Sequence, residues 1–271
     1  MAMDDIGRRG LVLLGCGKMG SAMLRGWLAR GLPPGAVTVI DPQPSDWVRG
    51  TGVRINADLP ADPAVAIVAV KPQMMGDALP ALRAVAGGRT VIVSIAAGTP
   101  IAAFEAAFGP DTRIVRAMPN TPAAVGRGIT AIVANARADA DDLTMAEELL
   151  LAVGEVARLA DEAQMDAVTG VSGSGPAYVF HMIEALAAAG EAQGLEPDLA
   201  LRLARGTVAG AGQLAMEADE TPTVLRENVT SPNGTTQAGL AVLMDADRGL
   251  APLIAATVAA AADRSRELSD G

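Results

Sequence analysis

Apolar residues in the first 160 positions gather in short runs separated by helical segments. The runs are rich in β-branched residues: LVLL (11–14), VTVI (37–40), VAIVAV (65–70), TVIVSIA (90–96), RIVRAM (113–118), GITAIVA (128–134) and EVARLA (155–160). Strand-sized runs that alternate with helices are typical of a mostly parallel, doubly wound sheet. Because the runs are continuously apolar, we expect helices on both faces of the sheet.

After Ala160 the pattern changes to helical segments rich in Ala, Leu and Met. Breaks are expected at Gly190, Gly194, Pro197, Pro222 and Pro232. We therefore expect an α/β domain over residues 1–163 and an all-helical domain over residues 164–271. The alanine-rich stretches are too apolar for solitary exposed helices, so we expect the helical domain to pack against a second subunit.

Composition narrows the possible functions. A formal charge of −10 argues against nucleic acid or an anionic membrane surface as a partner. Cys16 is the single cysteine and His181 the single histidine, which excludes an internal disulfide and multi-cysteine or histidine metal clusters. No signal-peptide pattern opens the chain and no apolar run is long enough to span a membrane, so we expect a cytoplasmic protein without a metal.

The segment LVLLGCGKMGSAM carries Gly15, Gly17 and Gly20 as G-x-G-x-x-G between a predicted strand and helix. In such a loop the first glycine makes the tight turn, the second lets the backbone approach a pyrophosphate, and the third lets the helix pack on the strand. The motif in this context predicts dinucleotide binding by a Rossmann-type domain. Cys16, Lys18 and Met19 complete the expected loop.

Asp41 ends the second predicted strand, 21 residues after Gly20. A carboxylate there can accept hydrogen bonds from the adenosine ribose and would repel the 2′-phosphate of NADP. Asp before Pro is also a common turn residue, so a purely structural role stays open. Further ligand contacts are expected after the third and fourth strands, in VAVKPQ and VSIAAGTP, although a solvated Lys71 is an equal alternative.

The stretch VTSPNGTTQAGL places six hydrogen-bonding or turn residues within 230–236, directly before an apolar run. One helix cap needs only one or two such residues. This density indicates a set of donors presented to a ligand at a helix N-terminus, where an anion is favoured.

Taken together, the motifs resemble the pyrroline-5-carboxylate reductase family over nearly the whole chain. They are GCGKMG, AVKPQ, VSIAAG, RAMPNTPA (116–123), GVSGSGPAYVF (170–180) and VTSPNGTT. The resemblance implies hydride transfer from NADPH or NADH to the C=N bond of 1-pyrroline-5-carboxylate, giving L-proline. The family pattern has two glycines after Ser-Pro, whereas this chain has Asn233 before Gly234; the departure is mild because Asn tolerates left-handed backbone.

The resemblance also implies roles for individual residues. The substrate would contact Val229, Ser231, Asn233, Gly234, Thr235 and Thr236, with Thr236 as the catalytic residue that orients and hydrogen-bonds the ring nitrogen. Besides the glycine loop and Asp41, the cofactor would contact Asn56, Val70, Lys71, Pro72, Ala96, Ala97, Met118, Pro119 and Asn120. The helical domain would form a homodimer, with a ring of dimers as an open alternative.

Two other functions remain open at this point. One is a reductase of another small cyclic imine or oxo acid on the same scaffold; the 3-hydroxyacid type would use a lysine in the helical domain, and the sequence has none after Lys71. The other is a dinucleotide-binding protein without turnover, which would have no need of the donor stretch before the apolar run.

Overall fold

The computed structural model describes residues 2–270 and divides the chain into two compact units. The first, called here the sheet unit, comprises Met1–Gly173 together with Ala261–Gly271; the second, the helical unit, is Ser174–Ala260. This division into compact units falls ten residues after the expected domain boundary, and the last turns of the chain belong with the sheet. Two contacts explain this return: Ser265 Oγ donates to Asp166 Oδ1 at 2.7 Å, and Leu268 lies against Gly98.

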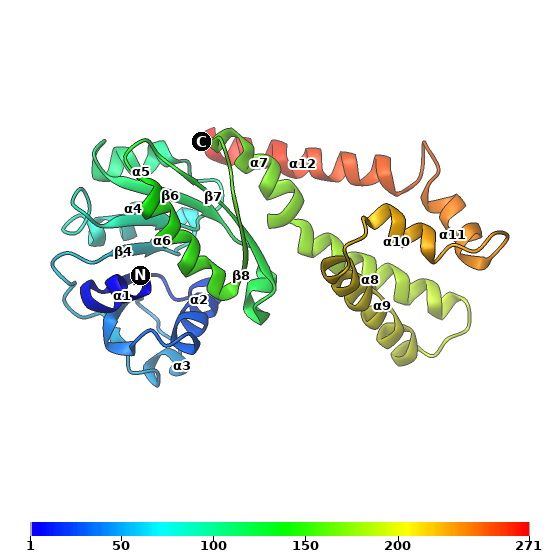
Figure 1. Cartoon of the computed structure of the whole chain (residues 1–271), viewed down its shortest axis with the longest axis horizontal. Helices are drawn as coiled ribbons and strands as arrows, with labels where there is room; N and C mark the ends of the chain where they lie inside the picture. The colour runs from blue at the N-terminus through cyan, green and yellow to red at the C-terminus, as the bar shows by residue number, and fades with distance from the viewer. Residues whose placement is uncertain (1, 271) are drawn as a thin grey trace. The chain divides into compact units, whose positions relative to one another are not determined.

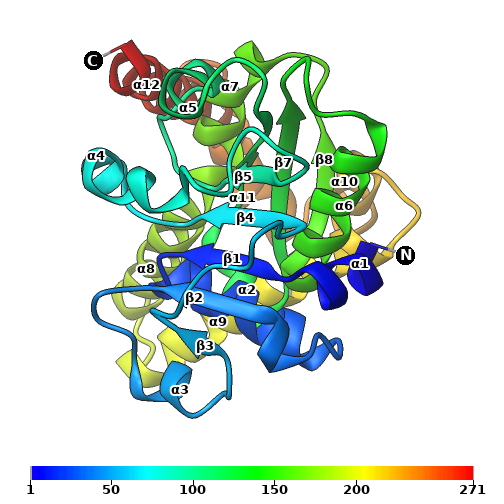
Figure 2. The same cartoon turned by 90° about the vertical axis from the view of Figure 1, so that its left-hand side faces the viewer.

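The sheet unit contains eight strands in the order β3-β2-β1-β4-β5-β6-β7-β8 (Figure 2). Their bounds are β1 Leu11–Leu14, β2 Val37–Ile40, β3 Arg54–Ile55, β4 Val65–Val68, β5 Val91–Ser94, β6 Arg113–Met118, β7 Gly128–Ala134 and β8 Gly154–Arg158. All neighbours pair in parallel except β6 and β7. The seven expected strands are confirmed; β3, with only two residues, carries no sequence pattern that predicts it.

Alternate residues of the central strands point to opposite faces of the sheet. Leu11 and Leu13 join one buried cluster, and Val12 and Leu14 join the other. The first face is covered by α1 (Ala2–Arg9), α2 (Lys18–Ala29), α3 (Asp46–Arg49) and α6 (Ala140–Leu150). The second is covered by α4 (Met75–Ala78), α5 (Ile101–Phe108) and α7 (Met165–Val168) (Figure 1). Burial on both sides is why the strand sequences are continuously apolar.

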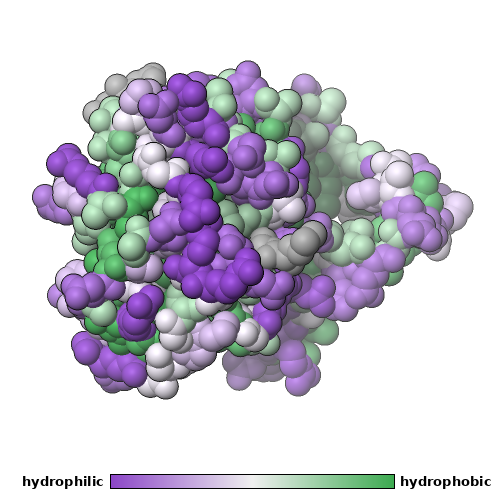
Figure 3. Space-filling model, turned by 60° about the vertical axis from the view of Figure 1, so that its left-hand side comes forward, coloured by the Kyte–Doolittle hydropathy of each residue, from purple (hydrophilic) through white to green (hydrophobic). Residues whose placement is uncertain are grey.

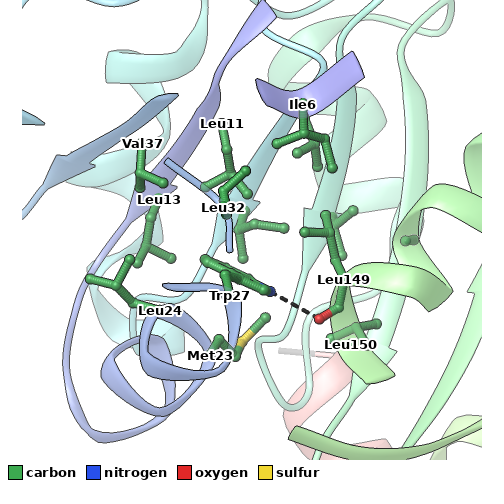
Figure 4. Packing of buried hydrophobic residues seen from close by; sticks show 14 of the residues in the cluster. Ile6, Leu11, Leu13, Met23, Leu24, Trp27, Leu32, Val37, Leu149 and Leu150 are labelled. Atoms are coloured by element: carbon green, nitrogen blue, oxygen red, sulfur yellow. Dashed lines mark hydrogen bonds between the residues drawn. The ribbon is translucent and has the colours of Figure 1, made fainter. Parts of the chain in front are cut away.

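Trp27 is the largest fully buried side chain in the first cluster. Its indole Nε1 donates to the carbonyl of Leu149 at 2.9 Å, which joins α2 to α6 over the sheet (Figure 4). Buried aromatic rings with a polar atom generally need such a partner. The helix that follows the glycine loop is therefore anchored at its far end by packing and by a hydrogen bond.

The helical unit contains α8 (Gly175–Ala192), α9 (Pro197–Glu217), α10 (Pro222–Asn228), α11 (Thr235–Leu243) and the first part of α12 (Leu250–Asp270). Helix breaks occur at Gly194, Pro197, Pro222 and Pro232 as expected, but Gly190 lies inside α8. A Cβ at Gly190 would lie 3.4 Å from that of Ala200. Gly190 therefore allows α8 and α9 to approach closely and does not end the helix.

The surfaces of the two units differ in character. Hydrophilic residues dominate the face of the sheet unit seen in Figure 3, with hydrophobic ones between them in smaller patches. In the helical unit, by contrast, large apolar side chains are exposed on every helix, including Phe180, Leu214, Met216, Val242 and Leu253. Within residues 2–270 no helix combines the length and apolarity needed to cross a membrane.

Candidate functional site

The glycine loop joins β1 to α2 and adopts the geometry that its sequence predicts. Gly15 has φ +88°, and a Cβ there would lie 2.8 Å from the carbonyl oxygen of Ala69. A Cβ at Gly20 would lie 2.5 Å from the carbonyl oxygen of Gly15. Both positions exclude a side chain because backbone approaches them, which confirms the turn and packing roles expected of these two glycines.

Gly17 differs from its two neighbours in the motif. It is exposed, and nothing lies within 4 Å of the position of a Cβ on this residue. It is the N-cap of α2, and no side chain caps the helix. Because the first-turn N–H groups of a helix have no acceptor within it, those of α2 are free to bind an anion in the open space beside Gly17. The loop thus fits a diphosphate.

Most of the other expected cofactor residues lie along one edge of the sheet. Leu14, Ile40, Val68, Ser94 and Arg116 stand in register across five parallel strands. The residues that follow them therefore share the carboxyl edge, where open α/β sheets bind ligands. The strand order reverses between β1 and β4, which puts Gly15 beside Ala69 and Val70.

The accessibility of the residues on this edge varies. Lys71, Pro72 and Ala97 are exposed, Val70 is half-buried, and Ala96 is buried. Lys71 is the N-cap of a short 3-10 turn, Pro72–Met74. Its side chain is therefore accessible at the carboxyl edge of the sheet.

Asp41 lies beside the glycine loop. Its Oδ2 accepts a hydrogen bond from Cys16 N and its Oδ1 one from Gln43 N, both at 2.7 Å. Asn56 holds the main chain of Asp41 in turn: Asn56 Oδ1 accepts from Asp41 N at 2.9 Å, and Asn56 Nδ2 donates to Asp41 O at 2.8 Å. The structural role left open for Asp41 is therefore present, and the carboxylate also lies at the expected end of β2.

The segment after β6 is more enclosed than expected of a ligand-contacting turn. Pro119 and Asn120 are buried, and Met118 is half-buried. Asn120 Oδ1 accepts from Ile129 N at 3.0 Å, and its Nδ2 donates to Ser172 O at 3.3 Å. The Asn120 amide thus ties this turn to neighbouring segments of the sheet unit.

The donor stretch forms the loop between α10 and α11. Helix α11 begins at Thr235 with Gly234 as its N-cap, and no side chain caps it. Gln237 reaches back to accept a hydrogen bond from Asn233 N. The side chains of Ser231, Thr235 and Thr236 are exposed, and their hydroxyls form no hydrogen bond with any residue in the 2–270 range. Helix capping therefore does not account for these hydroxyls.

Asn233 has φ +59°, one of two non-glycine residues with positive φ among the described positions. This conformation is the left-handed one that Asn tolerates. Asn233 can therefore stand where the family pattern has a glycine, because its backbone conformation is one that Asn adopts. Val229 and Asn233, like the three hydroxyl residues, are exposed.

One ion pair close to the carboxyl edge of the sheet was not predicted from the sequence. Arg116 on β6 is buried, and its Nη1 lies 2.6 Å from Glu162 Oε1. The same oxygen accepts from the N–H of Ile101, the first residue of α5, at 2.8 Å. An arginine within an apolar strand run is the one sequence signal that a buried partner is needed.

The thiol of Cys16 is enclosed within the glycine loop. Burial raises its pKa, the nearby Asp41 charge adds to the rise, and the contact with the Ser21 hydroxyl opposes it. The free thiol is thus kept neutral. Within residues 2–270 no group of three or more His, Cys, Asp or Glu side chains is placed to bind a metal ion.

Two family models match the chain. One, described as pyrroline-5-carboxylate reductase dimerisation, matches residues 162–268; the other, described as NADP oxidoreductase coenzyme F420-dependent, matches residues 10–98.

Full-length relatives agree with the first model. Pyrroline-5-carboxylate reductase of Synechocystis is 43% identical over 95% of this chain and 97% of its own, and that of Pseudomonas aeruginosa is 40% identical over 96% and 97%. The solved structure of a pyrroline-5-carboxylate reductase from Coxiella burnetii has a TM-score of 0.90 at 34% identity, covering 96% of this chain and 98% of its own. A Plasmodium falciparum pyrroline carboxylate reductase structure with NADP bound has a TM-score of 0.80 at 28% identity, with 96% and 98% covered. The chain belongs to the pyrroline-5-carboxylate reductase family.

Proposed function

We propose that this protein reduces 1-pyrroline-5-carboxylate to L-proline with NADPH or NADH. The observation that carries the proposal is the loop before α11, where exposed hydroxyls form no hydrogen bond with any residue that the structure describes. A protein that only bound a dinucleotide would have no use for such a loop. The full-length similarity to pyrroline-5-carboxylate reductases supports this specific substrate.

The substrate is a carboxylate, and the protein has a formal charge of −10. Binding this anion therefore requires local donors. The uncapped N–H groups at the start of α11 and the Ser231 and Thr235 hydroxyls supply them, and the helix dipole adds to the attraction. Val229, Asn233 and Gly234 shape the same loop. Thr236 lies at the second position of α11, and we assign it to orienting and hydrogen-bonding the ring nitrogen.

The sheet unit would hold the dinucleotide. The free N–H groups of α2 and the open space at Gly17 suit the diphosphate, and the carboxyl edge up to Met118 suits the remainder. The cofactor supplies hydride to the imine carbon. The protein's own residues bind and orient the two molecules, which is the usual division of labour in such enzymes. No strong protein acid is needed if the imine binds in its protonated form.

We further propose that the protein is a homodimer built through residues 164–271. Ala187, Ala200 and Ala204 are the buried hydrophobic residues of the helical unit, whereas Phe180, Leu214 and many others are exposed. Soluble monomers rarely leave that much apolar helix surface uncovered. Light scattering at micromolar concentration should give at least twice the chain mass of 27.4 kDa; a stable monomer would contradict the proposal. The same measurement would reveal a ring of dimers.

The cytoplasm is the compartment that suits a protein with a single, free and buried cysteine.

The decisive test is to incubate the purified protein with pyrroline-5-carboxylate and to follow the oxidation of NADH and NADPH separately. Proline formation that matches cofactor oxidation supports the proposal. The six-membered homologue of the substrate and a small 2-oxo acid serve as comparison substrates. Faster turnover of either would identify a different reductase, and no turnover of any, with dinucleotide binding intact, would leave a binding protein.

A further inference from the structure

The end of β2 is held by an unusually complete set of hydrogen bonds. Both carboxylate oxygens of Asp41 accept a backbone N–H, from Cys16 and from Gln43. The carboxylate group is therefore held in one orientation by two hydrogen bonds. The bond from Cys16 also ties the carboxylate to the glycine loop itself.

Asn56 fixes the main chain of the same residue. Its amide bonds to both the N–H and the carbonyl of Asp41, while its own N–H donates to Val39 O at 2.8 Å. The parallel ladder of β2 and β3 pairs Val39 with Ile55. The Asn56 side-chain amide thus extends the hydrogen bonding between β2 and β3 by one residue, because it bonds to the Asp41 main chain as a backbone peptide group would.

This arrangement requires a backbone conformation that most residues avoid. Asn56 has φ +49°, in the left-handed region. Such a residue persists only where its surroundings hold it in place. Here three hydrogen bonds do so, and their common result is that Asp41 keeps one position.

Resting on the proposed function, we propose that Asn56 is a positioning residue that makes the protein select NADH over NADPH, by fixing the Asp41 carboxylate where the 2′-phosphate of NADPH would lie. A carboxylate at this strand end faces the adenosine ribose in dinucleotide-binding sheets. An unrestrained side chain could rotate away from a phosphate. Asp41 cannot rotate without losing its bonds to Cys16 N and Gln43 N.

The Asp41 carboxylate has no cation within ion-pair distance among the described residues. Among residues 2–270, neither lysine nor arginine forms an ion pair with Asp41. Within the described part of the chain, the groups that donate hydrogen bonds to this carboxylate are backbone N–H groups. A ribose hydroxyl can donate to the carboxylate, whereas a phosphate can only be repelled by it.

The test compares the dissociation constants of NADH and NADPH, measured by fluorescence titration without substrate. ADP-ribose and its 2′-phosphate, which lack the nicotinamide ring, are titrated by calorimetry as a second pair. We expect wild type to favour the dinucleotide without the 2′-phosphate by about tenfold, or about 1.4 kcal/mol. Equal affinity for both members of each pair would overturn the proposal.

Asn56→Gly removes the amide while allowing the left-handed backbone at no steric cost. It should lower the NADH preference at least threefold. Asp41→Asn keeps an oxygen that can accept from Cys16 N but removes the charge, so it should abolish the preference. In the double variant the Asn56 change should have no further effect on the preference, because Asn56 acts through Asp41. Arg54→Ala, on the exposed side of β3, is the control for disturbance of this sheet edge.

An unchanged preference in Asn56→Gly would overturn the positioning role, as would an additive effect in the double variant. If Asn56→Gly fails to fold, Asp41→Asn still decides whether the carboxylate selects NADH. These readouts are independent of the reaction. A protein that prefers NADH but does not reduce pyrroline-5-carboxylate would contradict the proposed substrate and leave this inference intact.

Discussion

Glu162 joins the first residue of α5 to the buried arginine of β6: its Oε1 lies 2.6 Å from Arg116 Nη1 and 2.8 Å from Ile101 N. Helix α5 starts directly after the loop Ala96–Pro100 on the carboxyl edge. The N-cap of α5 is Pro100, which offers no side-chain acceptor. Glu162, 61 residues further along the chain, therefore caps the start of α5 in place of a neighbouring side chain. It also fixes the loop that we assign to the cofactor.

Breaking this pair should destabilise the protein. Arg116→Met keeps the length of the side chain but leaves the Glu162 carboxylate without its cation. We expect the free energy of unfolding to fall by about 1.5–3 kcal/mol, the usual range for a hydrogen bond to a charged group. Urea denaturation measures it. Glu162→Gln, which retains an acceptor for Ile101 N, should cost less, and the reverse order would contradict the assignment.

Two glycines of the same loop should respond in opposite ways to substitution. Gly17→Val adds atoms to open space, so thermal unfolding should stay near wild type while dinucleotide binding is severely weakened. Gly15→Ala introduces a Cβ 2.8 Å from Ala69 O at a positive φ, so it should lower the melting temperature itself. Scanning fluorimetry and a cofactor titration separate the two. Unchanged cofactor affinity in Gly17→Val would contradict the assignment of diphosphate binding to this loop.

The donor loop predicts a kinetic effect without a folding effect. Thr236→Ala should reduce kcat/KM by roughly tenfold to a hundredfold, because a hydrogen bond to a charged group is typically worth about 1.5–3 kcal/mol. Ser231→Ala should mainly raise KM for the carboxylate substrate and weaken inhibition by proline. Neither hydroxyl caps α11, so both melting temperatures should match wild type.

Gln237→Ala is the matched control for this loop, since Gln237 accepts the N–H of Asn233. Its loss should lower stability by about 1 kcal/mol, as for other helix-start contacts. Wild-type kinetics with lowered melting temperatures in Thr236→Ala and Ser231→Ala would return the loop to a structural role.

The buried thiol predicts a dependence of stability on pH. Burial raises the pKa of Cys16, so as pH rises past about 8.5 the unfolded chain loses this proton first. The free energy of unfolding should then fall with rising pH until the folded thiol also ionises. In Cys16→Ser the free energy of unfolding should depend less on pH over the range in which a thiol ionises, roughly pH 8 to 10. Iodoacetamide should react slowly with the native protein at pH 8 and rapidly in urea. Rapid native labelling would show that the thiol is accessible.

Sequence alone predicted the features that depend on local pattern. The apolar runs located the long strands because each run is buried on both faces, and the positions of Gly15 and Gly20 in the motif predicted where backbone approaches backbone. These are properties of neighbours along the chain, so a linear pattern records them. The left-handed conformation of Asn233 is one that this residue type tolerates, but the shape of its loop was not predicted.

The remaining features depend on partners far apart in the sequence. Asn56 reaches Asp41 across 15 residues, and Glu162 reaches Arg116 across 46. Neither pairing leaves a periodic trace. The return of the chain's last turns to the sheet was not predicted for the same reason, because the contact of Ser265 with Asp166 spans 99 residues.

The division of the chain into Met1–Gly173 with Ala261–Gly271 and an intervening Ser174–Ala260 bears on how the protein is made. During synthesis, domains generally fold in order of their emergence from the ribosome. The sheet can form once residue 173 has emerged, but the contacts of Ser265 and Leu268 with it must wait for the whole inserted unit. Completion of the first-made unit is thus linked to translation of the last helix, and a chain stalled before residue 261 would present a sheet unit that lacks its closing turn.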